Sequence, residues 1–365
     1  MNNMKQIFKG KKILITGHTG FKGAWLTQWL LKMDAKILGV SKGIPTKPSL
    51  YKELKLHKEI KSTYLDISKD DRLEKEVIKF QPDFIFHLAA QSLVKESYLN
   101  PIETFKTNTL GSVYLLNAIR KLKKNVYAVF ITSDKSYDNV EWSWGYRETD
   151  RLGGPDPYSG SKGAAEIAIS SFQRSFFPDE GNIKLSIGRA GNVIGGGDWS
   201  ENRIVPDCMK SASINKVTQI RNPNSTRPWQ HVLEPLSGYL LLAKNLYENK
   251  NIHGEAFNFG PSNDLNVSVK DLIKTMSKDW KKIKWKILRL DDGQKESSLL
   301  KLNCDKALHH LGWQAAWGFE DTVRETALWY KYFYENPSES IADFSLKQIA
   351  SYVDAAKLQG ISWSQ

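Results

Sequence analysis

Residues 12–23, KILITGHTGFKG, decide the fold that this chain is expected to adopt. KILIT is a short apolar run typical of a buried strand, and the segment after the glycines, FKGAWLTQWLLKM, has apolar residues at helical spacing. Gly17, Gly20 and Gly23 lie in the turn between them. Glycines let the backbone turn tightly and approach a pyrophosphate, which then lies at the N-terminus of the helix. The segment therefore predicts a strand, a phosphate-binding turn and a helix.

The same alternation continues along the first half of the chain. Strands are predicted over 35–40, 60–67, 83–90, 126–133 and 183–194, with helices after Ser68 and over 104–123 and 155–177. The strands are apolar on both faces, which is typical of a parallel sheet covered by helices on both sides. The expected fold class is α/β, a Rossmann-type doubly wound parallel sheet.

From Gly195 onward the pattern loosens into loops rich in Gly, Asn, Pro and Trp, with short helices between them. We expect these loops to form a smaller C-terminal substrate-binding lobe that interleaves with the first lobe in sequence. The predicted division assigns 1–191 and 227–260 to a dinucleotide-binding domain, 192–226 and 261–345 to the substrate lobe, and 346–365 to a C-terminal tail.

Composition narrows the class of protein. The chain has 365 residues, 41% of them hydrophobic, and a formal net charge of +12. No stretch approaches the roughly 18 consecutive apolar residues of a membrane span, so we expect a cytoplasmic protein without a membrane partner. The lysines occur in short clusters without a basic tail, which argues against a nucleic-acid partner. Cys208 and Cys304 lack metal-ligand spacing, and no metal site is expected.

The strand ends supply candidate contacts for a dinucleotide. Asp66 follows the third strand and can accept from an adenine amino group, although a charge at a helix N-terminus would explain it equally well. The second strand ends in Ser41 and Lys42 without a carboxylate for the ribose hydroxyls, which leaves NAD and NADP both open. The predicted cofactor-binding residues are Gly17, Thr19, Gly20, Phe21, Lys22, Gly23, Asp66, Ile67, Leu88, Ala89, Ala90, Asn108, Thr132, Tyr158 and Lys162.

A catalytic set is predicted at the start of the helix over 155–177. Tyr158 and Lys162 are four residues apart, so their side chains share one helix face. An ammonium beside a phenol favours the phenolate, which makes tyrosine a usable general base. Ser133, at the end of the preceding strand, can hydrogen-bond the same substrate hydroxyl. These residues predict oxidation of an alcohol by hydride transfer to a nicotinamide.

Asp134 and Lys135 come directly after Ser133 and extend this chemistry. A carboxylic acid and an amine side by side can protonate a leaving hydroxyl and remove a carbon-bound proton, which together make an elimination. The alternative is that Asp134 caps a turn and Lys135 is solvated.

Several longer motifs carry a family resemblance. TGHTGFKGAWL (16–26), HLAAQSLV (87–94), TSDKSYDN (132–139), residues 144–166, RAGNVIGGGDW (189–199) and residues 220–240 together resemble the CDP-glucose 4,6-dehydratases of the extended short-chain dehydrogenase/reductase superfamily. The resemblance covers residues 11–261 and continues more loosely beyond them. The glycine, tyrosine and lysine motifs occur throughout the superfamily, whereas TSDK, GGGDW and the segment over 220–240 are specific to this branch.

The resemblance implies a redox-neutral dehydration of a nucleotide sugar that yields a 4-keto-6-deoxy product for deoxysugar biosynthesis, including lipopolysaccharide O-antigen. Tyr158 would take the O4 proton, Lys135 the C5 proton, and Asp134 would protonate O6. Related dehydratases have a glutamate at the position of Lys135, where this chain departs from them. The resemblance also implies NAD as cofactor, and a homodimer or homotetramer formed by helices around 101–121 and 157–177. The substrate-binding residues that it implies are Gln91, Asn192, Arg203, Arg227 and His231.

Two other functions remain open from the residues. A nucleotide-sugar 4-epimerase needs Tyr158 and Lys162 but not the neighbouring acid and base. A non-catalytic dinucleotide sensor or nucleic-acid-binding protein would use the fold and the positive charge, and the intact Ser133, Tyr158 and Lys162 set argues against it. The base of the nucleotide cannot be derived from these residues.

Overall fold

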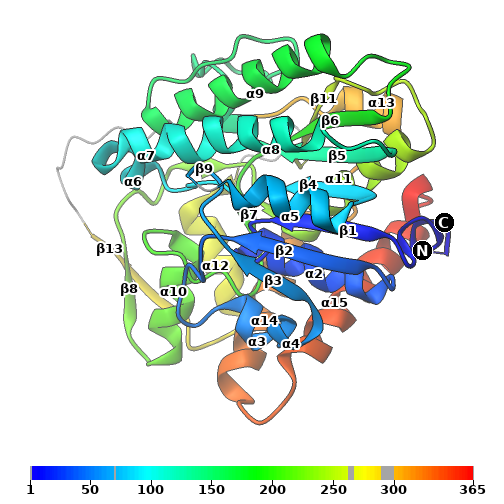
Figure 1. The fold of residues 1–365 in the computed structure, drawn as a ribbon. Coiled ribbons are helices and arrows are strands. Elements are labelled where there is room, and N and C mark those ends of the chain that lie inside the picture. Colours follow the sequence, from blue (N-terminus) through cyan, green and yellow to red (C-terminus); the bar gives the residue numbers. More distant parts are fainter. Residues whose placement is uncertain (1, 70, 262–266, 289–299, 365) are drawn as a thin grey trace.

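The main sheet has seven strands, each parallel to its neighbours (Figure 1). The structure is a computed structural model that describes residues 2–69, 71–261, 267–288 and 300–364. The strand order is β11-β6-β5-β4-β1-β2-β3. The strands are β1 (Lys12–Thr16), β2 (Lys36–Ser41), β3 (Lys61–Tyr64), β4 (Phe84–His87), β5 (Val126–Ile131), β6 (Ile183–Ala190) and β11 (Ala256–Phe259). The predicted doubly wound fold is confirmed.

The strand order reverses next to β1. The chain runs from β1 to β2 and β3 on one side, and then returns to place β4 on the other side of β1. Doubly wound sheets bind their ligands at such a reversal, at the carboxyl ends of the strands. The segments that follow β1, β3, β4 and β5 therefore meet at one edge of the sheet.

The ends of the predicted strands differ from the structure. The segment 60–67 forms a strand only over 61–64, and 183–194 divides into β6 and the short β7 (Val193–Ile194). The sequence pattern contained no prediction for β11, which pairs with β6 at the sheet edge. A four-residue strand such as β11 is too short to show a clear alternation.

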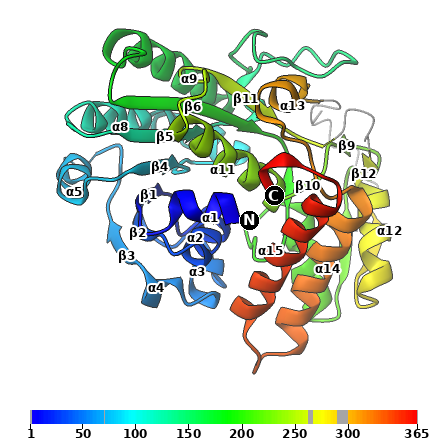
Figure 2. The ribbon, with the colours of Figure 1, turned by 90° about the vertical axis from the view of Figure 1, so that its right-hand side faces the viewer.

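Helices cover both faces of this sheet (Figure 2). On one face lie α5 (Arg72–Phe80), α8 (Gly111–Ile119) and α9 (Pro157–Phe176), and their apolar residues join those of the strands in one buried cluster. On the other face lie α2 (Phe21–Lys32) and α11 (Leu233–Tyr247). The shorter helices of this part are α1 (Asn2–Phe8), α3 (Leu50–Glu53), α4 (Leu56–Glu59), α6 (Val94–Leu99) and α7 (Pro101–Phe105).

The smaller lobe lies outside the sheet and its covering helices. Its helices are α10 (Ile204–Ser213), α12 (Val269–Asp279) and α14 (Phe319–Glu335), whereas α13 (Asp305–Leu311) packs against β11 and α11. Its short strands pair as β7 with β10 (Gln230–His231), β9 (Thr226–Arg227) with β12 (Val267–Ser268), and β8 (Val217–Ile220) with β13 (Lys284–Ile287). A single hydrophobic cluster connects α2 and α11 to α10, α12 and α14. The division at residues 192, 227 and 261 stays a prediction.

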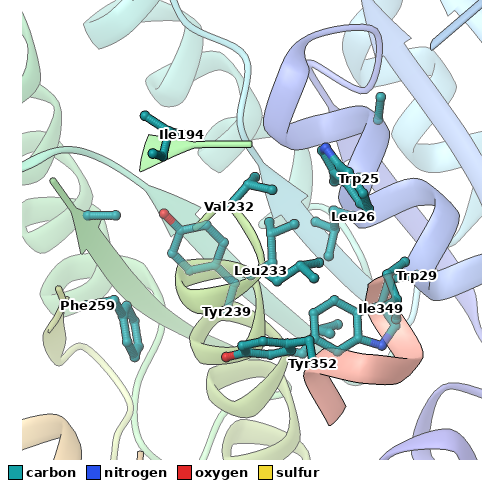
Figure 3. Packing of buried hydrophobic residues seen from close by; sticks show 14 of the residues in the cluster. Trp25, Leu26, Trp29, Ile194, Val232, Leu233, Tyr239, Phe259, Ile349 and Tyr352 are labelled. Carbon is teal, nitrogen blue, oxygen red and sulfur yellow. The ribbon is translucent and has the colours of Figure 1, made fainter. Parts of the chain in front are cut away.

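Both terminal segments within the described residues pack against the core, and the assignment of 346–365 to a separate C-terminal tail stays a prediction. Residues 346–365 include most of α15 (Ile341–Leu358) and a short 3₁₀ turn (Ser362–Ser364). Figure 3 shows Ile349 and Tyr352 of α15 beside Trp29 of α2, and the Trp29 and Tyr352 rings are 5.9 Å apart. At the other end, α1 buries Phe8, although no helix was expected there. None of the helices within the described ranges is long and apolar enough to cross a bilayer.

Candidate functional site

The glycine-rich turn fits a bound pyrophosphate. Gly17 has φ +78°, and a Cβ atom there would lie 2.7 Å from the Ala89 backbone nitrogen, so neither the conformation nor the space admits a side chain. A Cβ atom on Gly23 would lie 2.2 Å from the Gly17 carbonyl oxygen. Gly20 is the N-cap of α2, and because it has no side chain it does not cap the N–H groups of the first turn. Phe21 and Lys22 begin this turn. The α2 N-terminus thus stands beside the loop after β4, where an anion is stabilised.

Residues of the glycine-rich turn hydrogen-bond the end of β2. Thr19 Oγ1 donates to the Gly43 carbonyl oxygen at 2.6 Å. The His18 ring lies between Ser41 Oγ (2.9 Å from Nδ1) and Ser62 Oγ (3.0 Å from Nε2). Burial lowers the pKa of His18 to about 4, so the ring is neutral at pH 7. The ring therefore ties the turn to β2 and β3, a contact that the sequence did not indicate.

Asp66 lies after β3, where the sequence placed it. Its Oδ1 accepts from the Ser68 backbone nitrogen (3.0 Å) and hydroxyl (2.6 Å), and its Oδ2 is 3.2 Å from Lys42 Nζ. Partial burial raises the pKa of Asp66, but the hydrogen bonds from Ser68 and Lys42 outweigh it, and the pKa lies below its usual value. Ile67 is buried against Gly111 of α8. The Asp66 carboxylate is therefore ionised and forms an ion pair with the Lys42 ammonium.

The loop after β4 is held by Asn108. Leu88, Ala89 and Ala90 begin this loop, and Asn108 lies in a π-helical turn (η1, Lys106–Leu110) between α7 and α8. Asn108 Nδ2 donates to the Gln91 carbonyl oxygen (3.0 Å) and to Ser161 Oγ (2.9 Å), and its Oδ1 accepts from the Gln91 backbone nitrogen (2.8 Å). A π turn is a feature frequently found at functional sites.

The Gln91 side chain is used within this loop. Its Nε2 donates to the Leu93 carbonyl oxygen (3.1 Å) and to Thr104 Oγ1 (3.0 Å), and its Oε1 accepts from the Leu93 backbone nitrogen (2.6 Å). The Gln91 side chain therefore shapes the loop, and the substrate contact that the resemblance implied stays a prediction. A sequence alone does not show which partners an amide side chain finds.

Ser133, Tyr158 and Lys162 are brought together as expected. Asp156 caps α9 by accepting from the Ser159 backbone nitrogen at 2.9 Å, which places Tyr158 in the first turn and Lys162 one turn later. Ser133 lies close enough to the Tyr158 phenol to lower its pKa, and all three side chains are buried.

Burial shifts the pKa values of the tyrosine and the lysine in opposite directions. It raises the pKa of Tyr158 to about 12, although the Ser133 hydrogen bond acts against the shift. It lowers the pKa of Lys162 to about 8, although the Glu166 carboxylate acts against the shift. At pH 7 the resting pair is thus a phenol beside an ammonium.

Glu166 and Arg189 form a buried ion pair that the sequence did not indicate. Arg189 donates to Glu166 through Nε (2.9 and 3.0 Å) and Nη2 (2.5 Å), and its Nη1 donates to the Tyr137 hydroxyl at 2.6 Å. Thr132 Oγ1 also donates to Glu166 at 2.6 Å. The pair therefore ties α9, β6 and the end of β5 together, and holds Thr132 and Ser133 opposite Tyr158. The role predicted for Thr132 toward the cofactor stays a prediction.

Asp134 and Lys135 form a short 3₁₀ turn (η2, Asp134–Ser136) directly after β5. Ser133 caps this turn, because its Oγ accepts from the Lys135 backbone nitrogen at 3.2 Å and donates to Asp134 Oδ1 at 2.8 Å. Asp134 is buried, and Lys135 is half-buried. The Asp134 carboxylate lies close enough to raise the pKa of the Lys22 ammonium. The acid therefore lies inside the site and not on a solvated turn.

The structure places three more of the residues implied for substrate binding, and their contact with a substrate stays a prediction. Asn192 follows β6 and is half-buried, and its carbonyl oxygen accepts from the Gln230 backbone nitrogen at 3.3 Å. Arg203 is the N-cap of α10, donates to Asp198 Oδ2 at 2.8 Å, and is close enough to lower the pKa of Tyr158. Arg227 lies in β9, half-buried, and donates to the Thr226 carbonyl oxygen at 2.8 Å.

His231 lies in the core between two tryptophan rings. Its ring is fully buried, 4.9 Å from the Trp317 ring and 6.3 Å from the Trp25 ring. Burial lowers the pKa of His231 to about 3, so the ring is neutral. The residue lies in the core between α2 and the loop before α14, and its contact with substrate stays a prediction. Within the parts of the chain that the structure describes, His, Cys, Asp and Glu do not form a metal-binding group.

Comparisons with known proteins agree with this geometry. The family model described as GDP-mannose 4,6 dehydratase matches residues 14–326. The CDP-glucose 4,6-dehydratase of Salmonella typhimurium is 42% identical over 355 residues, which cover 96% of this chain and 98% of that protein. The dTDP-D-glucose 4,6-dehydratase of Dictyostelium discoideum is 28% identical over 91% of this chain and 84% of that protein.

A solved structure shows the same fold. It is the dTDP-glucose 4,6-dehydratase of Bacillus anthracis in complex with NAD, with a TM-score of 0.71 and 20% identity over 88% of this chain and 97% of that chain. The glycine turn, the buried Ser133, Tyr158 and Lys162 set and the acid after β5 are thus found in a chain whose relatives are nucleotide-sugar enzymes. The chain belongs to the GDP-mannose 4,6 dehydratase family, within the extended short-chain dehydrogenases/reductases.

Proposed function

We propose that this chain is an NAD-dependent CDP-glucose 4,6-dehydratase, a hydro-lyase that converts CDP-D-glucose to CDP-4-keto-6-deoxy-D-glucose and water. The observation that carries the proposal is the buried acid at Asp134, placed by Ser133 beside the Tyr158 and Lys162 pair. The 42% identity with a CDP-glucose 4,6-dehydratase over nearly the whole chain supports the same nucleotide.

The first step is oxidation at C4 of the sugar. Tyr158 takes the O4 proton, Ser133 hydrogen-bonds the same oxygen, and the Lys162 ammonium stabilises the phenolate that forms. Because burial favours the neutral phenol, this ammonium has to supply much of the stabilisation. The bound nicotinamide supplies a hydride acceptor for C4 and later a hydride donor for C6.

The second step is elimination of water. The new C4 ketone makes the C5 proton acidic, and Lys135 takes that proton while Asp134 protonates O6. The C5–H and C6–O6 bonds break, the C5=C6 double bond forms, and water leaves. After hydride reaches C6, the proton returns to C5 from Lys135, which leaves the 4-keto-6-deoxy sugar. Asp134 suits this role because its position next to Ser133 brings it close to the oxygens of the same sugar.

NAD is the proposed form of the cofactor. The extra 2′-phosphate of NADP needs a cation near the end of β2. Lys42 lies there, but its ammonium is paired with the Asp66 carboxylate at 3.2 Å. An ionised Asp66 also suits an adenosine better than a phosphate, because like charges repel.

The diphosphate of the nucleotide sugar is proposed to meet Asn192, Arg203 and Arg227. Guanidinium groups bind diphosphate oxygens through paired hydrogen bonds. Arg203 suits this role because it lies within electrostatic reach of Tyr158 and Lys22. The sugar, which follows the diphosphate, then lies toward the catalytic residues.

The test is incubation of the purified protein with CDP-glucose, dTDP-glucose and GDP-mannose in separate reactions, with mass analysis for the loss of one water. Loss of water from CDP-glucose alone, without net formation of NADH, supports the proposal. Loss from another nucleotide sugar alone overturns the CDP assignment. Inversion at C4 without a change in mass overturns the dehydratase and indicates an epimerase.

We also propose that the chain forms a homodimer or homotetramer in the cytoplasm. Helices α6, α7, α8 and α9 pack side by side, and several of their apolar side chains are exposed. These are Tyr98, Leu99, Ile102, Phe105, Tyr114 and Ile167. A second copy of this face would cover them. Sedimentation equilibrium of the wild type and of Ile102→Asp tests this, because a dimer through the face dissociates in the variant.

A further inference from the structure

Lys22 brings a positive charge into the site that no carboxylate neutralises by direct contact. It is the second residue of α2, directly after the glycine-rich turn. Among the residues that the structure describes, its ammonium makes no hydrogen bond and no ion pair, and its nearest aromatic contact is the Tyr239 ring, with Nζ 6.0 Å from the centroid. The side chain is half-buried.

The surroundings of this ammonium are the catalytic residues. Burial lowers the pKa of Lys22 to about 8, with the Asp134 carboxylate raising it and the Arg203 and Lys162 cations lowering it further. The side chain therefore reaches from the phosphate-binding turn to the end of the site where Asp134 and Lys162 lie. It carries its charge at pH 7.

Tyr239 is a second unusual residue next to Lys22. Its side chain is fully buried, and its hydroxyl has no hydrogen-bond partner within the described part of the chain. Burial raises the pKa of Tyr239, and the proximity of Tyr158 and Asp134 raises it further. In Figure 3 the hydroxyl points away from α11 toward Ile194. Among the described residues, a buried hydroxyl without a partner and an ammonium without an ion pair thus lie at the same ring, near Tyr158 and Asp134.

A bound dinucleotide accounts for this pair of groups. Its pyrophosphate lies at the turn that contains Gly17 and Gly23, and its nicotinamide has to reach Tyr158 for hydride transfer. Lys22 belongs to the first turn of α2, and its ammonium is within electrostatic reach of Asp134 and Lys162, so it would face a dinucleotide bound in this way. The oxidised nicotinamide ring carries a positive charge and the reduced ring carries none, so a nearby ammonium repels the first and not the second.

We propose that Lys22 is a residue that tunes the redox balance of the bound cofactor, by destabilising the oxidised nicotinamide relative to the reduced one. This inference rests on the proposed NAD cofactor. It adds a redox role to the cofactor contact that the sequence predicted for Lys22. Its consequence for the reaction is a bias toward C4 oxidation: the hydride is held on the cofactor while the elimination proceeds. The Asp134 carboxylate alone would have the opposite effect, so the two charges compete at this site.

The test compares the dissociation constants of NAD+ and NADH, measured separately by quenching of tryptophan fluorescence without substrate. The variants are Lys22→Met, which removes the charge at similar volume, and Lys22→Arg, which keeps it. Lys32→Met, at the exposed C-terminal end of the same helix, is the matched control. Lys22→Gln replaces Lys22→Met if circular dichroism shows that the latter is unfolded.

The expected result is a fall of about tenfold in the ratio of the NAD+ to the NADH dissociation constant in Lys22→Met, mainly through tighter NAD+ binding. Lys22→Arg and Lys32→Met keep the wild-type ratio. A merely structural role would weaken both nucleotides equally, and an unchanged ratio in Lys22→Met overturns the inference. If the wild type binds neither nucleotide, the proposed cofactor fails first and the inference fails with it.

Discussion

Replacing Glu166 by glutamine tests whether the buried ion pair below the catalytic residues holds the fold together. Both side chains are almost fully buried, at 2% exposed for Glu166 and 4% for Arg189. Glutamine keeps an acceptor for Thr132 but leaves the guanidinium charge in the core without its carboxylate. Removal of one partner from a buried pair costs about 3–5 kcal/mol. Because Arg189 keeps its bonds to the Tyr137 hydroxyl and the Glu148 carbonyl oxygen, we expect about 3 kcal/mol.

The assay is urea unfolding of the purified protein at pH 7, followed by circular dichroism. The control is Glu248→Gln. It removes the surface ion pair between Glu248 and Lys244, which lie one helical turn apart with a distance of 3.0 Å from Lys244 Nζ to Glu248 Oε2. This change should lower the free energy of unfolding by at most about 0.5 kcal/mol. A loss in Glu166→Gln no greater than in the control would refute the reasoning. It would mean that water reaches Arg189 or that the chain relaxes around it.

Three further changes address catalysis and pH. Tyr158→Phe should reduce dehydration of CDP-glucose by at least about a hundredfold while NAD+ still binds, and a variant with wild-type turnover would remove Tyr158 as the base. Lys135→Met should still form bound NADH from CDP-glucose, seen by absorbance, but lose no water by mass analysis; continued water loss would assign the C5 base elsewhere.

Burial raises the pKa of Glu234 to about 7, whereas the unfolded value is about 4.3. The folded chain therefore holds an extra proton between these values, and stability should fall by roughly 3 kcal/mol as pH rises from about 4.5 to 7.5. In urea unfolding, the stability of Glu234→Gln should not show this fall with pH. The same dependence of stability on pH in the variant and the wild type would contradict the prediction.

The sheet and its cofactor turn were predictable because they depend on local patterns. The apolar run over 12–16 and the spacing of the glycines are contiguous in sequence, and the structure places them as β1 and the start of α2. The C-terminal helix α15 was missed because its buried face meets α2, more than three hundred residues earlier in the chain. Short strands such as β11 were missed because four residues carry too little pattern.

The candidate site was predictable where motif and strand end coincide. Ser133, Tyr158 and Lys162 converge as expected, because the end of β5 and the start of α9 are adjacent in a doubly wound sheet. Glu166 and Arg189 are ordinary helix and strand positions in sequence, and only the packing of α9 on the sheet shows that they meet. The burial of His231 was not predictable, because Trp25 and Trp317, which surround its ring, are far from it in sequence.

The packing of α15 also decides the order in which the chain can complete its fold during synthesis. The sheet and α11 are made well before residues 341–364 leave the ribosome, so the surface around Trp29 is formed without the Ile349 and Tyr352 side chains that cover it. The last helix then closes the core, and the Tyr352 hydroxyl donates to Glu234 Oε2 at 2.7 Å. A chain truncated before residue 341 would therefore have an open apolar face and would not merely be shorter.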